Sequence, residues 1–217
     1  MLRCSSGRGF APRGCAHPAT PWLALLLLVL HQPYVARAET GNSEVGVRAS
    51  VLHAGDSVTD AMVGAGIRWR YHVADDWFVV FSLDSYRYDL VDPYAHVPAR
   101  TVVFATALGK RRRDLDRGID WFWDAGIGLG VSAVSGLTGE QANGRRYDLH
   151  VETGVGIHLG VSAGAAFAFS PHWSIVAAGR VEHQFVDMQI IERVSGESRS
   201  VDKLSPLGLS LSLNYRF

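Results

Sequence analysis

The sequence predicts an all-β protein, a single eight-stranded antiparallel up-and-down barrel, on three observations. Apolar residues recur at every second position in long segments, connections of different length separate these segments, and no amphipathic helix of useful length lies between them. The last segment, LGLSLSLNYRF, alternates without a break from Leu207 to Phe217. Because successive side chains of a strand point to opposite faces, each such segment has one apolar face.

The first element is a secretory signal peptide, which we expect to be removed. Residues 1–38 contain four arginines and no acid, then the short apolar run WLALLLLVL and the small-residue site ARA. The run is too short to cross a bilayer, which needs about 20 apolar residues. Residues 39–217 are then one barrel domain of 217 − 38 = 179 residues, with a formal charge of 17 − 21 = −4 that does not favour nucleic acid as a partner. Both cysteines are removed with the signal peptide, so no disulfide framework is expected.

The alternating segments follow in order along the remaining chain. We expect strands at 44–52, 62–73, 77–88, 100–110, 119–132, 153–169, 173–186 and 206–217. These are long strands, because soluble proteins cluster near about 5–6 residues per strand. A tilted strand that spans a bilayer needs about 9–11 residues. Strand length therefore favours a transmembrane barrel.

The second face of each strand carries small residues and isolated charges, as in Gly64, Gly66, Arg68 and Arg70. The water-facing side of a soluble sheet would carry Lys, Glu and Thr, yet the whole chain has two lysines. Small residues and a few charges suit the crowded interior of a narrow barrel. The expected inward charges are Glu44, Arg48, Arg68, Arg70, Asp84, Asp124, Arg180, Glu182 and Arg216. We interpret them as a salt-bridge network that fills the barrel, since unpaired buried charges are prohibitively costly, with a gated ion path as the alternative.

The connections differ in length. Those at 74–76, 110–118 and 170–173 are compact, whereas those at 53–60, 89–99, 133–150 and 187–204 include the longest. Short periplasmic turns and longer outer loops are typical of outer-membrane barrels. Aromatic residues cluster near the compact turns and predict a girdle at that membrane interface: Trp69, Tyr71, Trp77, Trp121, Trp123, Trp173 and Tyr215. The opposite interface is expected to be marked by Tyr86, Tyr88, Tyr147 and Phe185.

The final strand places Leu209, Leu211, Leu213, Tyr215 and Phe217 on its apolar face. An alternating last strand that closes on an aromatic residue resembles the C-terminal signal that the barrel-assembly machinery reads in Gram-negative outer-membrane barrels. The whole chain after the signal peptide is similar in pattern and length to the small eight-stranded outer-membrane β-barrel family of the OmpA/OmpX type. The resemblance implies an outer-membrane location, contact with membrane lipids and lipopolysaccharide, and partnership with the assembly machinery during insertion. We expect the protein to be a monomer.

Three motifs that could suggest chemistry have simpler interpretations. The glycines of GIGLG at 126–130 and GVGIHLG at 154–160 lack the spacing and the strand-to-helix context of a phosphate loop, and alternate glycines suit a lumen face. His150 and Glu152 are the one tight pair with ligand-like spacing, which is too little to predict a metal or other cofactor. The basic run KRRRD at 110–114 is expected to be a solvated turn, or a contact to lipopolysaccharide phosphates if the barrel has the opposite orientation.

An enzyme is a weaker interpretation. Some small outer-membrane barrels modify lipid A, and the stretch VEHQF at 181–185 resembles the His-containing strand of the deacylase. That family has a serine two positions after its histidine, where this chain has Phe185, so His183 lacks an adjacent nucleophile. We therefore expect a non-enzymatic outer-membrane protein with an envelope-structural or surface-interaction role through its outer loops. Passage or binding of a small apolar solute is the lead alternative, and it requires an apolar lumen.

Overall fold

The computed structural model describes residues 42–54, 59, 61–91, 95–114, 118–134, 136–141, 144–152 and 154–217. Within these residues the chain forms eleven strands, and no helix there is long and apolar enough to cross a membrane. The expected signal peptide at 1–38 lies outside the described residues.

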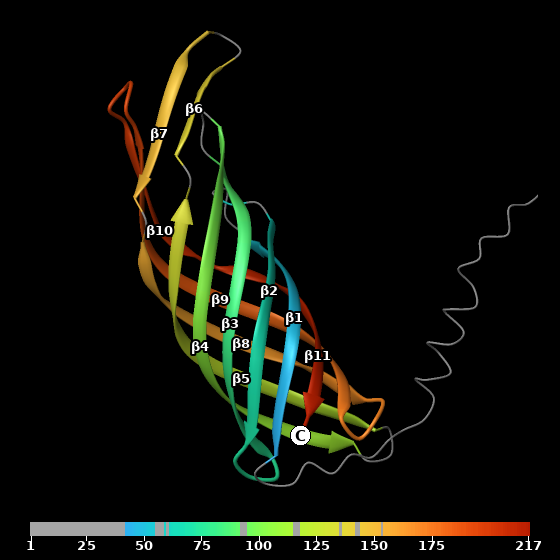
Figure 1. The fold of residues 1–217 in the computed structure, drawn as a ribbon. Helices are drawn as coiled ribbons and strands as arrows, with labels where there is room; N and C mark the ends of the chain where they lie inside the picture. The colour runs from blue at the N-terminus through green and yellow to red at the C-terminus, as the bar shows by residue number, and fades with distance from the viewer. Residues whose placement is uncertain are drawn as a thin grey trace, which may run out of the picture. The chain divides into compact units, whose positions relative to one another are not determined.

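Eight of the strands close into an antiparallel barrel (Figure 1). They are β1 (Ser43–Ala54), β2 (Ala61–His72), β3 (Trp77–Val91), β4 (His96–Asp114), β5 (Ile119–Val134), β8 (Val155–Ala168), β9 (Trp173–Glu192) and β11 (Pro206–Arg216). Each strand pairs with the barrel strand that follows it in the chain, and β11 pairs with both β9 and β1. The predicted fold class is confirmed.

The seam between β1 and β11 is continuous. It runs from the pair Glu44↔Arg216 to the pair Ala54↔Pro206 without a register shift. Closure of the sheet leaves these two strands no open edge, so their backbone N–H and C=O groups are hydrogen-bonded on both sides along the seam.

The barrel wall has two chemically different faces. Apolar side chains point outward and stay exposed on every barrel strand, up to 67% for Val155 and 72% for Leu209. The residues between them point inward and are buried, as the alternating pattern of β1 shows. The core of this molecule therefore lies inside the barrel, while the largest apolar surface lies outside it.

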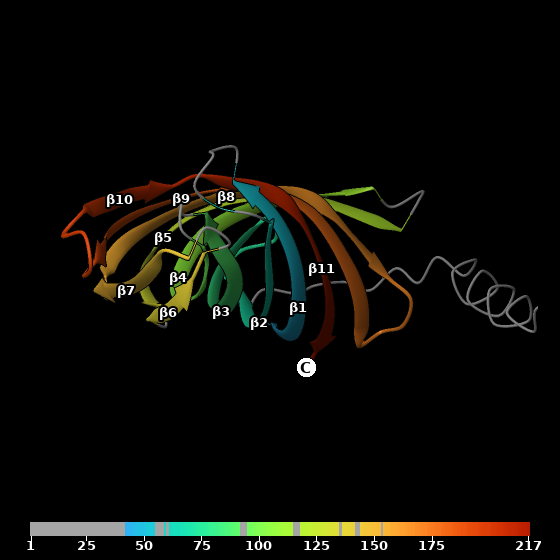
Figure 2. The same cartoon turned by 90° about the horizontal axis from the view of Figure 1, so that it is seen from above.

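Three shorter strands extend the structure beyond the barrel: β6 (Leu137–Glu140), β7 (Arg146–Glu152) and β10 (Ser198–Leu204). Residues 189–192 of β9 pair with β7 on one side, and β10 pairs with β9 on the other. The result is a four-stranded outer sheet in the order β6-β7-β9-β10, at the end of the barrel away from the C-terminus (Figures 1 and 2).

The structure corrects three predicted boundaries. The segments 133–150 and 187–204 are not plain loops, because they contain β6, β7 and β10 and because β9 continues past its expected end at 186 to Glu192. The inward positions Met188 and Ile190 stay apolar and buried, which gives the longer strand a core to pack on. The predicted loop 89–99 is also too long, since β3 ends at Val91 and β4 begins at His96.

Candidate functional site

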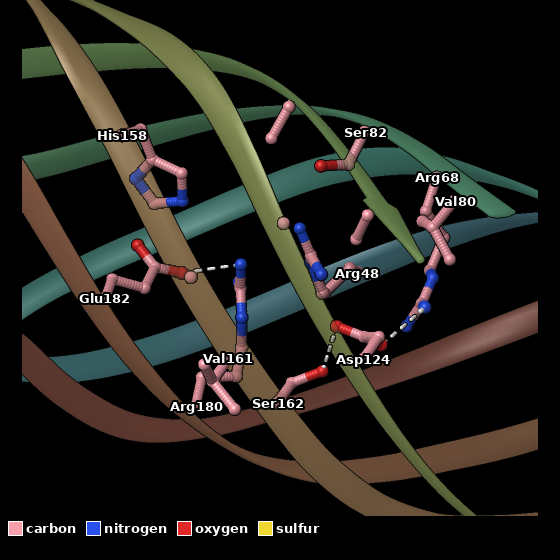
Figure 3. A pocket seen from close by; sticks show the side chains of 14 residues that line it. Arg48, Arg68, Val80, Ser82, Asp124, His158, Val161, Ser162, Arg180 and Glu182 are labelled. Carbon is pink, nitrogen blue, oxygen red and sulfur yellow. Dashed lines mark hydrogen bonds and ion pairs between the residues drawn. The ribbon is translucent and has the colours of Figure 1, made fainter. Parts of the chain in front are cut away.

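The middle of the barrel interior holds three charge pairs. Arg48 donates two hydrogen bonds to the carboxylate of Asp84, one of them from Nε at 3.1 Å. Arg180 Nη2 lies 2.5 Å from Glu182 Oε1 on the same strand. The third pair is looser, with Arg68 Nη2 3.8 Å from Asp124 Oδ2. Five strands supply these six side chains, so the network connects distant parts of the wall. Figure 3 shows five of the six: Arg48, Arg68, Asp124, Arg180 and Glu182.

Neutral hydroxyl groups complete the network. The hydroxyl of Tyr86 donates to Glu182 Oε1 at 3.2 Å and accepts from Arg180 Nη1 at 2.9 Å. Arg180 Nη1 also lies 3.3 Å from Ser50 Oγ, and Ser162 donates to Asp124 Oδ1 at 2.6 Å. Buried charges are tolerable only when they are paired and hydrogen-bonded, and these hydroxyls supply part of that requirement.

A second cluster surrounds Glu44 near the C-terminus. Its carboxylate accepts from Arg70 Nη1 at 3.3 Å and from Arg216 Nε at 3.0 Å, and lies 3.3 Å from His72 Nε2. The guanidinium carbon of Arg70 lies 4.5 Å from the centre of the Phe78 ring. One carboxylate thus serves two arginines, and an aromatic face supports the excess positive charge.

A small polar cavity of about 40 Å³ lies among the middle charges, against the glycine-rich inner faces of β5 and β8. Four buried side-chain atoms near it have no protein hydrogen-bond partner: Arg68 Nε, Asp124 Oδ2, His158 Nδ1 and Glu182 Oε2. Since a water needs about 10–15 Å³ and two to four polar partners, this volume has room for ordered water. The cavity is far too small for a pore.

The half of the interior nearer the outer sheet is apolar, which corrects the expectation of a charged lumen throughout. Its buried cluster is formed by Leu52, Met62, Tyr86, Tyr88, Leu90, Val97, Ala99, Val103, Leu149, Val151, Val186, Met188, Ile190, Val201 and Leu204. The inward positions of the strands change from charged to apolar along the barrel. The strand β1 shows this directly, from Glu44 and Arg48 to Leu52.

Tyr86 and Tyr88 are part of this interior, so their predicted place at a membrane interface is wrong. Both are buried, and Tyr88 Oη lies 2.8 Å from Thr101 Oγ1. Their position follows from strand parity: the odd-numbered Phe81 and Leu83 of β3 point outward, so the even-numbered tyrosines point inward. Phe185 does lie on the outer face of β9.

The seven aromatic residues assigned to the girdle all lie on the outer surface, within a few residues of the strand ends on the side of the C-terminus. They pack in small groups across the strands. The Trp173 and Tyr215 ring centres are 5.0 Å apart, those of Trp77 and Trp123 are 6.2 Å apart, and Trp69 stacks on Phe81. Leu209, Leu211, Leu213 and Tyr215 are likewise exposed along β11, as is Phe217 directly after it.

The basic run at 110–114 is in strand β4, so its assignment to a solvated turn is wrong. Arg111 points inward and is buried, and its Nε and Nη2 donate to the carbonyl of Asp75 at 3.1 and 3.0 Å. Its Nη1 lies 3.8 Å from Asp120 Oδ2. Arg111 is thus an interior charge that sequence reasoning missed. Alternation continued from Val103 through Gly109 would have identified it.

His183 does have a hydroxyl neighbour, which the local sequence did not reveal. Its Nδ1 lies 2.7 Å from Oγ of Ser205, the residue that directly follows β10. Its ring packs edge-on against Phe185. His150 and Glu152 are both exposed on β7. Among the residues that the structure describes, no group of three His, Cys, Asp or Glu side chains is arranged to hold a metal ion.

Glu192 organises the outer sheet at the turn between β9 and β10. Its carboxylate accepts hydrogen bonds from the backbone amides of Val194 and Asp148, both at 3.1 Å, and from that of Ser195. A side-chain hydrogen bond with Ser195, followed by these backbone bonds, lowers the pKa of Glu192 from 4.5 to about 2. The carboxylate therefore fixes the hairpin turn and joins it to β7.

The closed sheet, its apolar outer face and its packed interior define the class of small outer-membrane β-barrels. OprG from Pseudomonas aeruginosa is similar in structure, with a TM-score of 0.65 and 11% identity over 85% of this chain and 99% of that one. A major outer membrane protein from Thermus thermophilus gives 0.55 and 15% over 82% and 99%, and neisserial surface protein A gives 0.53 and 14% over 82% and 98%. At such identities the likeness is one of fold. No protein-family model matches the sequence, and no curated protein matches it.

Proposed function

We propose that the protein is a non-enzymatic barrel of the Gram-negative outer membrane that holds its outer sheet at the cell surface. The observation that supports this proposal is the apolar outer face of the barrel, which continues over all eight strands. Monomeric soluble proteins rarely expose apolar patches of more than a few hundred Å². A closed barrel with this face buried in acyl chains satisfies both its side chains and its backbone.

The outer sheet is the part of the protein that supports a surface role. It projects from the barrel beyond the apolar face, and β6 and β10 are its edge strands (Figure 1). Edge strands present unpaired backbone groups that can accept a strand from a partner. Its attachment through β9, which is also a barrel strand, holds this surface rigidly on the membrane anchor.

Export through the signal peptide 1–38 and recognition of the β11 strand by the barrel-assembly machinery complete the proposal. Cell fractionation followed by gel electrophoresis with and without boiling tests it. We expect the protein in the outer-membrane fraction, with a mobility shift on heating. Recovery as a freely soluble periplasmic protein would contradict the proposal.

The absence of enzymatic activity is part of the same proposal and has its own test. His183 Nδ1 lies 2.7 Å from Ser205 Oγ, and among the described residues no carboxylate forms a hydrogen bond with this histidine. A nucleophilic serine needs a base that a third group orients. We expect the lipid A acyl pattern, measured by mass spectrometry, to be the same with the wild-type protein and with Ser205→Ala. Loss of an acyl chain only with the wild-type protein would establish an enzyme.

A second candidate function is the binding of a small apolar solute. The apolar half of the interior nearer the outer sheet favours it. The wall next to it carries a groove of about 340 Å³ where β8 stops pairing with β9, lined by Leu129, Val155, Gly156, Ile157, Phe185 and Val186. Uptake of a radiolabelled alkane into proteoliposomes tests this candidate, with Val186→Trp to fill the space. Uptake no faster than in protein-free vesicles would exclude it.

A further inference from the structure

Two arginines face each other on the outside of the barrel. Arg87 of β3 and Arg100 of β4 are directly opposed in the strand register, and both are exposed. Like charges directly opposite each other destabilise a sheet. The pair is therefore unfavourable unless an anionic group compensates for its charge.

The protein itself compensates little of this charge. Arg100 Nε donates to Ser85 Oγ at 2.9 Å, which orients its guanidinium and leaves the outer edge of the group available. Among the residues that the structure describes, neither arginine forms an ion pair. Among the described residues, Asp89 is the acid that lines the same groove, so two positive charges meet one negative charge there.

The height of the pair on the barrel matches a membrane interface. Trp77 pairs with Lys110 at the opposite end of these two strands, and Arg87 and Arg100 each lie ten residues further along. Ten residues span about 34 Å of strand, or about 26 Å along the axis at a tilt of about 40°. The apolar band of an outer-membrane barrel is about 25 Å tall, so the arginines lie at its outer edge.

The surface around the arginines is hollowed. An open groove of about 640 Å³ is lined on its outer side by Val63, Arg87, Asp89, Pro98, Arg100 and Ala133. Its walls are apolar and its charged groups are the two arginines and one acid. This combination suits a ligand that has an anionic head and an apolar body.

We propose that Arg87 and Arg100 bind a phosphate monoester of a lipid headgroup in the outer leaflet. A phosphate between the two guanidinium groups relieves their repulsion and accepts charge-assisted hydrogen bonds from both. The acyl chains of the same lipid lie along the apolar side chains below. The inference rests on the proposed outer-membrane location, because the assignment of height requires that membrane.

Binding of phosphorylated lipid A to the refolded protein in detergent tests the inference, with native mass spectrometry as the readout. Dephosphorylated lipid A of the same acyl composition is the reference ligand. We expect the wild-type protein to prefer the phosphorylated form about tenfold, as one strong charge-assisted interaction implies. Arg87→Gln/Arg100→Gln should lose this preference.

Arg112→Gln is the matched control, since Arg112 is also exposed on the outer face of β4, at its other end. It should keep the preference. Equal binding of both lipids by the wild-type protein, an unchanged preference in the double variant, or saturation of the site by inorganic phosphate alone would overturn the inference.

The heat-induced mobility shift of each sample distinguishes failure of the lipid-binding inference from failure of the proposed outer-membrane function. A protein that shifts on heating and inserts into bilayers but shows no phosphate preference refutes the lipid site alone. A protein that never forms a heat-modifiable barrel refutes the membrane location.

Discussion

Arg48 and Asp84 show what single side chains contribute inside this barrel. Both are buried, and their two hydrogen bonds join β1 to β3 across β2. Removing one partner of a buried pair leaves an uncompensated charge, which costs about 3–5 kcal/mol, whereas replacing both by apolar groups is often neutral. The pair therefore fixes which side chains meet in the interior more than it adds net stability.

We predict that Asp84→Asn lowers the free energy of unfolding by about 3 kcal/mol. The double variant Arg48→Met/Asp84→Leu should recover most of that loss. Urea unfolding in lipid vesicles, followed by tryptophan fluorescence, measures both. If the single and double variants are equally unstable, the pair itself does not account for the effect.

Glu192 makes the outer sheet sensitive to acid. Its pKa is about 2 in the folded protein and near 4.5 otherwise, so the stabilisation is present above pH 4.5 and is lost as pH falls toward 2. We predict that amide exchange at Val194 and Ser195, compared with the intrinsic rate at each pH, accelerates over this window. Glu192→Gln should remove the pH dependence, and exchange that is independent of pH in the wild-type protein would contradict the prediction.

Strand β9 is the element that links the barrel to the outer sheet. Its twenty residues pair with β8 and β11 in the barrel and with β7 and β10 beyond it. Its inward residues Val186, Met188 and Ile190 continue the apolar cluster into the outer sheet. The outer sheet is thus held by packing as well as by the backbone ladder.

We predict that Met188→Asp exposes the outer sheet to protease while the barrel stays folded. Met188 is fully buried, and an unpaired charge there has no partner in the apolar cluster. Gln189→Asp is the control, because Gln189 is exposed on the opposite face of the same strand. Trypsin cleavage near Arg193 and Arg199, read by mass spectrometry, should increase only for the first variant. Equal cleavage of both would show that packing does not hold the sheet.

Sequence patterns predicted the elements well where alternation was long and uninterrupted. All eight barrel strands were expected, because one face of each is apolar over at least nine residues. The short strands β6, β7 and β10 were not expected, although the Asn-Gly sequence at 143–144 is a hairpin signal. Gly144 has φ +82° in the structure. Contacts between distant segments, such as His183 with Ser205, depend on how the hairpins fold back, and no local pattern carries that information.

At the scale of the whole molecule, the interior is filled in two layers. Charged and hydrogen-bonded residues occupy the half near the C-terminus, together with a small apolar cluster of Phe78, Val80, Phe122, Val176 and Ala178, and a larger apolar cluster occupies the other half. An eight-stranded barrel has an interior just wide enough for side chains to fill. Neither layer provides a continuous aqueous path.

We predict that the protein forms no steady ion channel in planar lipid bilayers. The apolar layer excludes hydrated ions because moving a charge into it without a partner is very costly. Single-channel recording at neutral pH measures this, with protein-free bilayers as the control. Regular, reproducible conductance steps from the purified protein would refute the filled interior.

The seam between β1 and β11 has a consequence for biogenesis. The first and last barrel strands along the sequence are hydrogen-bonded partners, although more than 150 residues separate them. Until β11 has been synthesised, the barrel cannot close, and the partly formed sheet has two unpaired edges. Such edges can pair with strands of other nascent chains. We therefore expect the unclosed polypeptide to require a chaperone that prevents its association with other copies until the barrel closes.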